Sequence, residues 1–198
     1  TREPDGSWST SPGGLVRALL PTVKETGGSW VGWTGTLGGA DEHLHHEGID
    51  LHAVALTDDE VHHYYEGMSN DTLWPLYHDA IRDSSYDGTS WDVYVAVNQR
   101  FARRVAEVAP QAAAVWIHDY HLQLVPTALR ALRPDLRIGF FDHIPFPPLE
   151  LFRRMPWRAE VIDGLLGADV IGFQRPSDAT NMIAAALDLL QGVEAPEP

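Results

Sequence analysis

The segment from residue 112 to residue 148 constrains the fold most, because two short apolar runs flank one amphipathic run. Residues 114–117 and 138–141 have the length and the β-branched or aromatic content of buried strands. Between them, residues 122–133 carry apolar side chains at helical spacing, namely Leu122, Val125, Leu129 and Leu132. This order of strand, helix and strand is typical of an α/β fold with a parallel sheet.

Polar clusters follow both predicted strands. The cluster Asp119-Tyr120-His121 follows the first strand by one residue, and Asp142 and His143 follow the second. In open α/β sheets, ligands bind beyond the carboxyl ends of parallel strands, where both clusters fall. We therefore expect the active-site edge here. From the residues alone, the two acids and His143 at this edge could act in acid–base or nucleophilic catalysis.

The rest of the chain repeats the alternation of helices and strands, which predicts a doubly wound parallel sheet with right-handed crossovers. The pattern predicts helices over 15–26, 91–108, 150–155, 158–166 and 178–190, a helix starting at 57–60, and strands over 30–33, 51–56 and 170–173. A hairpin is expected to end near Trp8.

Composition excludes several classes of partner. The chain of 198 residues has 14 Lys and Arg against 28 Asp and Glu, and its net charge of −14 argues against nucleic acid or an anionic membrane as the main partner. It has no cysteine, which excludes disulfides and thiolate metal sites and fits a cytoplasmic location. No run approaches the roughly 20 apolar residues of a membrane span.

Five histidines invite a zinc hypothesis, but their spacing matches no usual ligand pattern and acidic loops often carry histidine. They are His43, His45, His46, His62 and His63. We therefore predict neither a metal nor a cofactor.

The two ends of the sequence suggest that further chain precedes and follows it. The sequence opens on Thr1 rather than methionine, and its polar, proline-rich residues 194–198 are typical of a linker. We expect further chain at both ends.

Several residues fit either a sugar site or ordinary packing. Gly13 and Gly14 open a helix, where exposed N–H groups could meet phosphate or sugar oxygens, although a plain turn is equally compatible. Trp33, Tyr65 and Trp74 lie among glycine and short polar residues, as in carbohydrate sites, but a buried aromatic cluster would look the same.

With these residues laid out, the chain resembles the trehalose-6-phosphate synthase family. The matching motifs are SPGGL at 11–15, GSWVGWTG at 28–35, YYEGMSNDTLWPLYH at 64–78, VNQRFA at 97–102, VWIHDYHLQLVP at 115–126, RIGFFDHIPFPP at 137–148 and LLGADVIGFQRP at 165–176. The resemblance implies the GT-B fold of two Rossmann-like domains. Residues 1–192 would be the N-terminal, acceptor-binding domain without its first strand, and 193–198 would begin the linker to a C-terminal nucleotide-sugar domain.

The resemblance also implies roles for the donor side of the site. Gly13 and Gly14 match the loop that closes on the donor. His143 matches the histidine that contacts the donor glucose near the reacting centre, and Ile144 beside it shapes the same pocket.

On the acceptor side, Trp33, Tyr65 and Trp74 match the acceptor-site aromatics; Tyr65 would reach the phosphate and Trp74 would help select the anomer. Asp119 matches the acid that binds the hydroxyls of glucose 6-phosphate, a role compatible with capping the following helix. His118 and His121 flank Asp119 and are assigned no role.

The implied activity is transfer of glucose from UDP-glucose to glucose 6-phosphate with retention of configuration and without a metal, His143 and Asp119 being the residues nearest the chemistry. The domain would be inactive alone, and the protein could form a homo-oligomer. Alternatives are a relative with another nucleotide donor or a cyclitol acceptor, or a non-catalytic sugar-phosphate sensor.

One residue departs from the family pattern, because Asp142 stands where an apolar residue, commonly leucine, is usual. Neighbours on a strand face opposite ways, so Asp142 is expected to point into the domain, away from His143. A buried carboxylate must find a donor, reach water, take up a proton or perturb the site.

Overall fold

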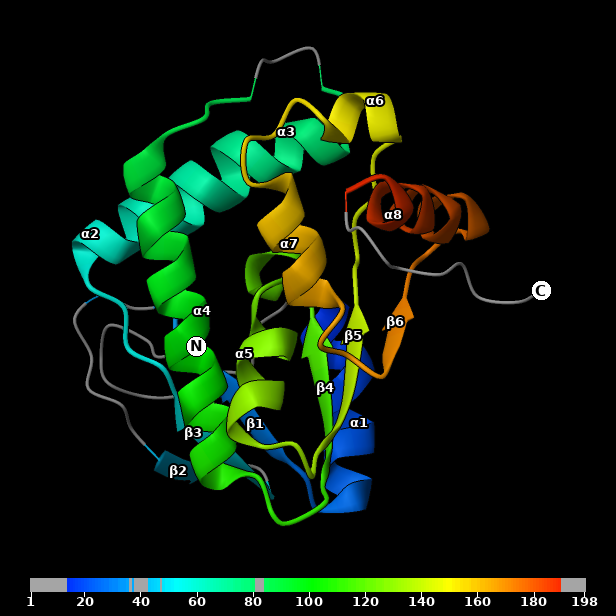
Figure 1. Cartoon of the computed structure of the whole chain (residues 1–198). Helices are drawn as coiled ribbons and strands as arrows, with labels where there is room; N and C mark the ends of the chain where they lie inside the picture. The colour runs from blue at the N-terminus through cyan, green and yellow to red at the C-terminus, as the bar shows by residue number, and fades with distance from the viewer. Residues whose placement is uncertain (1–13, 36, 38–42, 47, 81–83, 190–198) are drawn as a thin grey trace. The chain divides into compact units, whose positions relative to one another are not determined.

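The computed structural model describes residues 14–35, 37, 43–46, 48–80 and 84–189, which divide into two compact units, 1–61 and 62–198. Figure 1 shows the helices and strands of each unit. The predicted hairpin at Trp8, the glycine Gly13 and the linker at 193–198 lie outside the described residues.

The first unit holds a three-stranded sheet. Its elements are α1 (Gly14–Thr26), β1 (Ser29–Gly32), β2 (His43–His46), β3 (Ile49–Ala53) and α2 (Asp58–Glu60). The strands lie in the order β1-β3-β2, with β1 parallel and β2 antiparallel to β3. The sequence predicted no strand around these histidines. Residues 43–46 have no apolar alternation, but pairing with β3 makes them an edge strand, where polar side chains are tolerated.

Local signals set the helix ends in this unit as predicted. The backbone of Gly27 has a φ of 63°, and Gly28 donates to the carbonyl of Val23 at 2.9 Å, which ends α1. Thr57 Oγ1 accepts from the Glu60 N–H at 3.2 Å, and Glu60 Oε2 accepts from the Thr57 N–H at 3.0 Å. This reciprocal pair is the capping box that starts α2.

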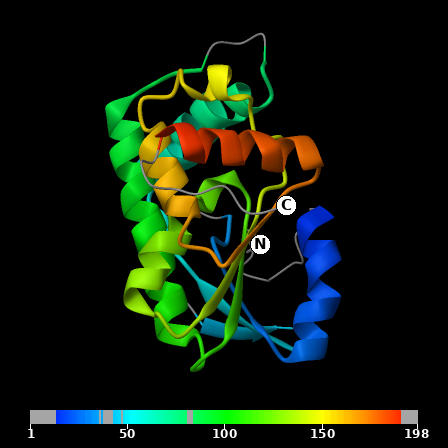
Figure 2. The same ribbon diagram turned by 45° about the vertical axis from the view of Figure 1, so that its right-hand side comes forward.

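The second unit is built on a parallel sheet with the strand order β4-β5-β6. Its elements are η1 (Val61–Leu73), α3 (Trp74–Tyr77), α4 (Gly88–Val108), β4 (Ala114–His118), η2 (Tyr120–Leu122), α5 (Val125–Leu132), β5 (Arg137–Phe141), α6 (Leu149–Phe152), α7 (Arg158–Leu165), β6 (Val170–Gly172) and α8 (Pro176–Leu189). The parallel α/β architecture is confirmed, and Figure 2 shows α4, α5 and α7 together on one side of this sheet.

The two faces of this sheet differ. Ile117, Ile138 and Phe140 are buried and alternate with exposed or half-buried positions, as expected for a face covered by helices. On the opposite face, Trp116 is 58% exposed and Val170 is 69% exposed. The core of the unit therefore lies between the sheet and the helices on one side.

The helix predicted over 122–133 is shorter in the structure. A 3₁₀ turn, η2, comes first, and α5 begins only at Val125 because Pro126, which lacks an N–H, suits the first turn of a helix. Close packing follows: a Cβ on Gly167 would lie 2.3 Å from Thr127 Cα, so only glycine fits against α5 there.

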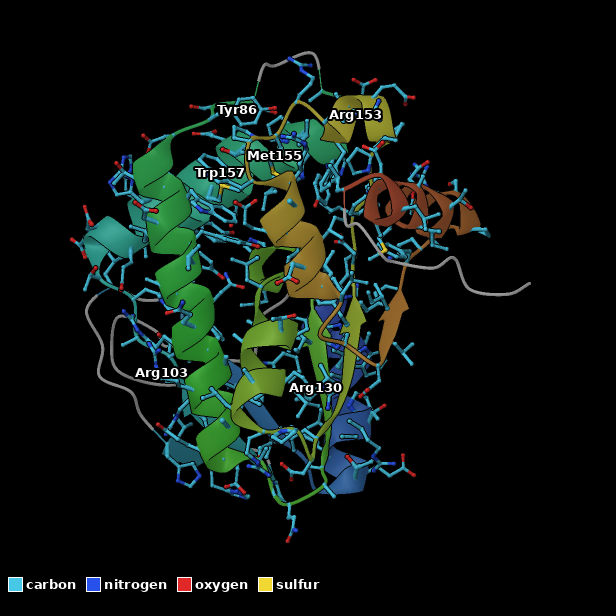
Figure 3. The ribbon with its side chains drawn as sticks, in the orientation of Figure 1. Tyr86, Arg103, Arg130, Arg153, Met155 and Trp157 are labelled. Atoms are coloured by element: carbon cyan, nitrogen blue, oxygen red, sulfur yellow. The ribbon has the colours of Figure 1, made fainter. Side chains whose placement is uncertain are left out.

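Side chains tie the loops of the second unit to its helices (Figure 3). Arg130 on α5 donates to the carbonyl of Leu136 at 2.7 Å and to that of Gly167 at 3.3 Å. Leu136 precedes β5 in the sequence and Gly167 follows it. Between α6 and α7, the Trp157 ring stacks on Trp91 of α4, with centroids 5.0 Å apart and planes within 3°. Within the described ranges, none of the helices is long and apolar enough to span a membrane.

Candidate functional site

The site begins where β4 ends, at a residue with an unusual backbone. Asp119 has φ 76° and ψ 159°, a region that essentially only glycine occupies without strain. Its N–H donates to the carbonyl of Phe141 on β5 at 2.8 Å. Holding a residue in this region costs about 1–3 kcal/mol, and such residues cluster at functional sites. The strain marks Asp119 as a candidate for function.

Buried polar side chains hold the turn after Asp119 in place. Tyr94 on α4 donates its hydroxyl to the carbonyl of Tyr120 at 2.7 Å and accepts from the Gln123 N–H at 3.3 Å. Asn98, one helical turn later, donates to the carbonyl of His121 at 3.1 Å and accepts from the Leu124 N–H at 3.1 Å. These bonds let the surrounding structure impose the strained backbone.

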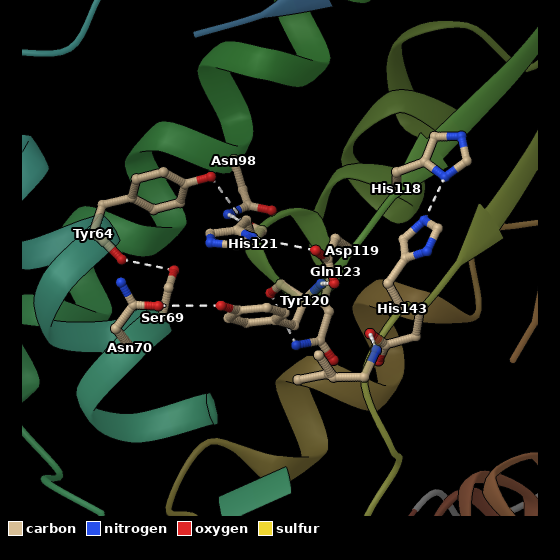
Figure 4. Close-up of polar contacts among 12 residues, drawn as sticks. Tyr64, Ser69, Asn70, Asn98, His118, Asp119, Tyr120, His121, Gln123 and His143 are labelled. Carbon is tan, nitrogen blue, oxygen red and sulfur yellow. Dashed lines mark hydrogen bonds and ion pairs between the residues drawn. The ribbon is translucent and has the colours of Figure 1, made fainter. Parts of the chain in front are cut away.

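The helical segment η1 supports the same turn from another direction. Tyr64 donates its hydroxyl to the carbonyl of His121 at 3.2 Å, and the Tyr120 hydroxyl donates to Asn70 Oδ1 at 3.1 Å (Figure 4). Ser69 Oγ donates to the carbonyl of Tyr64, five residues earlier, at 2.8 Å, in keeping with the wide π-helical turns of this segment. The sequence indicated a helix start here but not its π-helical geometry.

The carboxylate of Asp119 is partly exposed. Its Oδ1 accepts from the Tyr120 N–H at 3.1 Å, which confirms the capping role, and its Oδ2 lies 4.0 Å from His121 Nδ1. The side chain is 24% exposed. The ring of His121 stacks on Tyr65, with centroids 5.4 Å apart, and Tyr65 is itself 38% exposed. An acid, a histidine and an aromatic face thus lie together in positions suited to sugar hydroxyls.

Two histidines meet at the next strand. His118 Nδ1 lies 3.0 Å from His143 Nε2, a hydrogen bond in which the protein's tautomer decides which ring donates (Figure 4). Burial, with a contribution from His143, lowers the pKa of His118 to about 4, while Asp119 raises it. Burial likewise lowers the pKa of His121. The sequence predicts no role for His118 or His121, because local patterns do not show partners that the sheet brings together.

Asp142 is fully buried, as expected from its position on the strand. Its Oδ1 accepts from the Ile144 N–H at 3.4 Å, and its Oδ2 has no hydrogen-bond partner among the described residues. Burial, and then the nearby charge of Asp119, raise the pKa of Asp142 well above its ordinary value. The carboxyl group therefore favours the neutral, protonated form.

The other site residues predicted from the sequence fall as follows. Trp74 begins α3, is 40% exposed and stacks on His78 with centroids 4.2 Å apart. Ile144, half-buried, directly follows His143. In the first unit, Gly14 begins α1 and Trp33 directly follows β1. The structure brings Tyr65, Asp119 and His143 into one unit, and the roles assigned to all these residues stay predictions.

The zinc hypothesis has no support among the residues that the structure describes, where no group of three or more histidine, aspartate or glutamate side chains is arranged to hold a metal ion. In the first unit, His43 Nε2 and His45 Nδ1 both lie 3.2 Å from Asp50 Oδ1. They hold the edge strand to β3 through this carboxylate.

Curated proteins of similar sequence are trehalose-6-phosphate synthases. A curated trehalose-6-phosphate synthase from Mycolicibacterium smegmatis is 53% identical over 191 residues, which cover 96% of this chain and 38% of that protein. One from Mycobacterium tuberculosis is 54% identical over 192 residues, covering 92% of this chain and 38% of that protein. The chain thus spans well under half the length of these relatives.

Solved structures agree in fold. An E. coli structure described as trehalose-6-phosphate bound with UDP-2-fluoro glucose matches with a TM-score of 0.87 at 30% identity, over 96% of this chain and 43% of that one. A Burkholderia xenovorans trehalose-phosphate synthase in complex with glucose-6-phosphate matches with a TM-score of 0.85 at 31% identity, over 94% of this chain and 42% of that one. The chain corresponds to the N-terminal portion of a GT-B glycosyltransferase.

The family model for glycosyltransferase family 20 matches residues 1–197, nearly the whole chain. The chain belongs to glycosyltransferase family 20.

Proposed function

We propose that this chain is the acceptor-binding part of a trehalose-6-phosphate synthase, which transfers glucose from UDP-glucose to glucose 6-phosphate with retention of configuration. Residues 1–192 form the acceptor domain in this proposal, and 193–198 lead toward a nucleotide-sugar domain. The names of the curated relatives and the ligands of the solved relatives support both substrates.

Asp119, with its strained backbone and partly exposed carboxylate, is the observation that supports the proposal most directly. A carboxylate accepts strong hydrogen bonds from sugar hydroxyls, and the exposed ring of Tyr65 lies against its neighbour His121. Asp119 binds the acceptor and Tyr65 reaches its phosphate in this assignment. Trp33 and Trp74 complete the acceptor side.

His143 and Ile144 contact the donor glucose, and Gly13 and Gly14 belong to the loop that closes on it. The bond from the anomeric carbon to the UDP phosphate breaks while the acceptor hydroxyl attacks the same face. The hydroxyl proton passes to the leaving phosphate oxygen, so the balance needs neither a protein nucleophile nor a metal. Positioning of both sugars and stabilisation of the developing charge supply most of the rate enhancement.

Asp142 is the one feature that favours the alternative of a non-catalytic sugar-phosphate sensor, because a charged acid in this place would disturb the neighbouring His143. Its raised pKa argues for a neutral group and thus for an undisturbed site. A different nucleotide or a cyclitol acceptor is the closer alternative. The nucleotide is chosen by the domain that this chain does not contain in our proposal.

The test uses this chain continued to the full length of its curated relatives, hereafter the extended protein. We expect turnover of UDP-glucose with glucose 6-phosphate, measured as released UDP and as trehalose 6-phosphate. GDP-glucose, ADP-glucose and a cyclitol acceptor serve as competing substrates. Binding of glucose 6-phosphate without turnover of any donor would favour the sensor instead. Turnover by residues 1–198 alone would contradict the two-domain assignment.

A further inference from the structure

The pairing of two histidines across β4 and β5 has a cause in the strand register. His118 is the last residue of β4, and its partner across the ladder is Phe141, the last residue of β5. His143 follows Phe141 by two residues, so both histidines project from the same face of the sheet. Nδ1 of His118 and Nε2 of His143 thereby come within 3.0 Å.

Aromatic rings flank the pair on this face. The ring of Trp116 lies 4.7 Å from that of His118, and the ring of Phe141 lies 4.9 Å from that of His143, measured between centroids. The Phe141 ring lies over Gly172, where an added Cβ would come within 2.6 Å of the ring. The row of rings therefore restricts how His118 and His143 can turn.

The hydrogen bond uses one nitrogen of His143 and leaves the other available. Within the described part of the chain, Nε2 bonds to His118, and no protein group bonds to Nδ1. Because the bond fixes the ring by its Nε2 edge, Nδ1 has one defined direction. A histidine meant to meet a ligand needs such a partner, which sets both its orientation and its tautomer.

We propose that His118 is a positioning residue for the transfer reaction, holding His143 by its Nε2 so that Nδ1 of His143 faces the donor sugar. This inference rests on the proposed function, in which His143 contacts the donor glucose. His118 itself touches neither sugar. It acts only through His143.

The electrostatic surroundings suit this task. Asp119 and His143 are the titratable groups that act on His118, and burial lowers its pKa to about 4. His118 is therefore neutral at physiological pH. A neutral imidazole does not repel a proton on its partner and can either donate to or accept from Nε2 of His143.

The test compares two substitutions in the extended protein. In His118→Asn, the amide places a donor and an acceptor near the position of Nδ1, whereas His118→Phe keeps a ring but removes the hydrogen bond. We expect kcat to fall by about 10–100-fold in His118→Phe and by less than about 5-fold in His118→Asn, since misplacement of a reacting group has effects of this size. The KM for glucose 6-phosphate should stay unchanged in both.

His63→Phe is the matched control, because this half-buried histidine also bonds through Nδ1, to Ser90 Oγ at 3.2 Å, but has no part in the site. Its kcat should equal that of the parent. Equal kcat values for His118→Phe and His63→Phe, or an Asn variant as slow as the Phe variant at equal melting temperature, would overturn the inference.

Ring-nitrogen NMR of ¹⁵N-histidine-labelled extended protein gives a readout that does not depend on turnover. We expect His143 to show one fixed tautomer in the parent and in His118→Asn, and averaged ring-nitrogen shifts in His118→Phe. Averaged shifts in the parent would overturn the positioning role whatever the kinetics. An inactive parent with a fixed His143 would refute the proposed function instead, so the two failures are distinguishable.

Discussion

The strained backbone of Asp119 gives the sharpest prediction, because a substitution there can raise stability while it lowers activity. Replacing Asp119 with alanine or with glycine removes the same carboxylate and the same cap on the Tyr120 N–H. The two variants differ in one respect. Alanine must adopt φ 76° and ψ 159° with a Cβ, whereas glycine adopts this conformation freely.

The magnitude follows from two opposing terms. Relief of backbone strain favours Asp119→Gly by about 1–3 kcal/mol. The greater freedom of glycine in the unfolded chain offsets about 0.5–1 kcal/mol of this. We therefore expect Asp119→Gly to be more stable than Asp119→Ala by about 1 kcal/mol, within a range of about 0–2.5 kcal/mol. Each 1 kcal/mol corresponds to about 2–4 °C in melting temperature for a domain of this size.

Activity should not follow stability in this pair. Both variants lack the carboxylate that binds the acceptor, and a hydrogen bond to a charged group contributes about 1.5–3 kcal/mol. The kcat/KM for glucose 6-phosphate should therefore fall by about 10–150-fold in both. The measurements are urea and thermal unfolding of the extended protein followed by circular dichroism, and release of UDP.

Two results would refute this reasoning, each at a different step. An alanine variant at least as stable as the glycine variant would show that the backbone at Asp119 is unstrained. A glycine variant with parental kcat/KM would show that the carboxylate does not bind the acceptor.

Three further predictions concern neighbouring residues. Burial raises the pKa of Asp142, so the folded protein binds the extra proton and stability falls as the pH rises above the ordinary value of 3.8; Asp142→Asn should therefore gain more stability over the parent at pH 8 than at pH 4 in urea unfolding, and an equal gain at both would contradict the raised pKa. His118 has its pKa lowered from 6.5 to about 4, so its contribution to stability is present above pH 6.5 and is lost as the pH falls toward 4; His118→Asn should flatten the unfolding free energy across this window, and an unchanged slope would argue against a neutral His118. Gly172→Ala should lower kcat without changing the KM for glucose 6-phosphate, because its Cβ would meet the Phe141 ring at 2.6 Å and shift the ring beside His143, whereas Gly88→Ala, with nothing within 4 Å, is the control and should behave as the parent.

Local sequence patterns predicted most of the helices and strands correctly. The apolar runs at 114–117 and 138–141 are strands, the helix over 91–108 is present, and the capping box at Thr57 starts a helix. Each of these depends on residues within a few positions of one another, so the chain alone reveals it. The burial of Asp142 followed from strand alternation in the same way.

Where pairing or packing decides the conformation, the same patterns failed. Residues 43–46 carry no strand pattern and form β2 only because β3 offers an edge. The helix predicted over 122–133 begins only at Val125, because Pro126 suits its first turn and because Tyr94 and Asn98 of α4 bond the turn before it. No spacing along the chain reports such partners.

Local sequence patterns predict which residues stand at the carboxyl ends of β4 and β5, and the family resemblance nominates Asp119 and His143 among them. Their surroundings come from the tertiary fold: the strained backbone of Asp119, the stacking of His121 on Tyr65, and the bond between His118 and His143, which are 25 residues apart. The reason is physical. Strand register and helix packing bring distant residues together, and it is those contacts, rather than residue identity, that orient a side chain and shift its pKa.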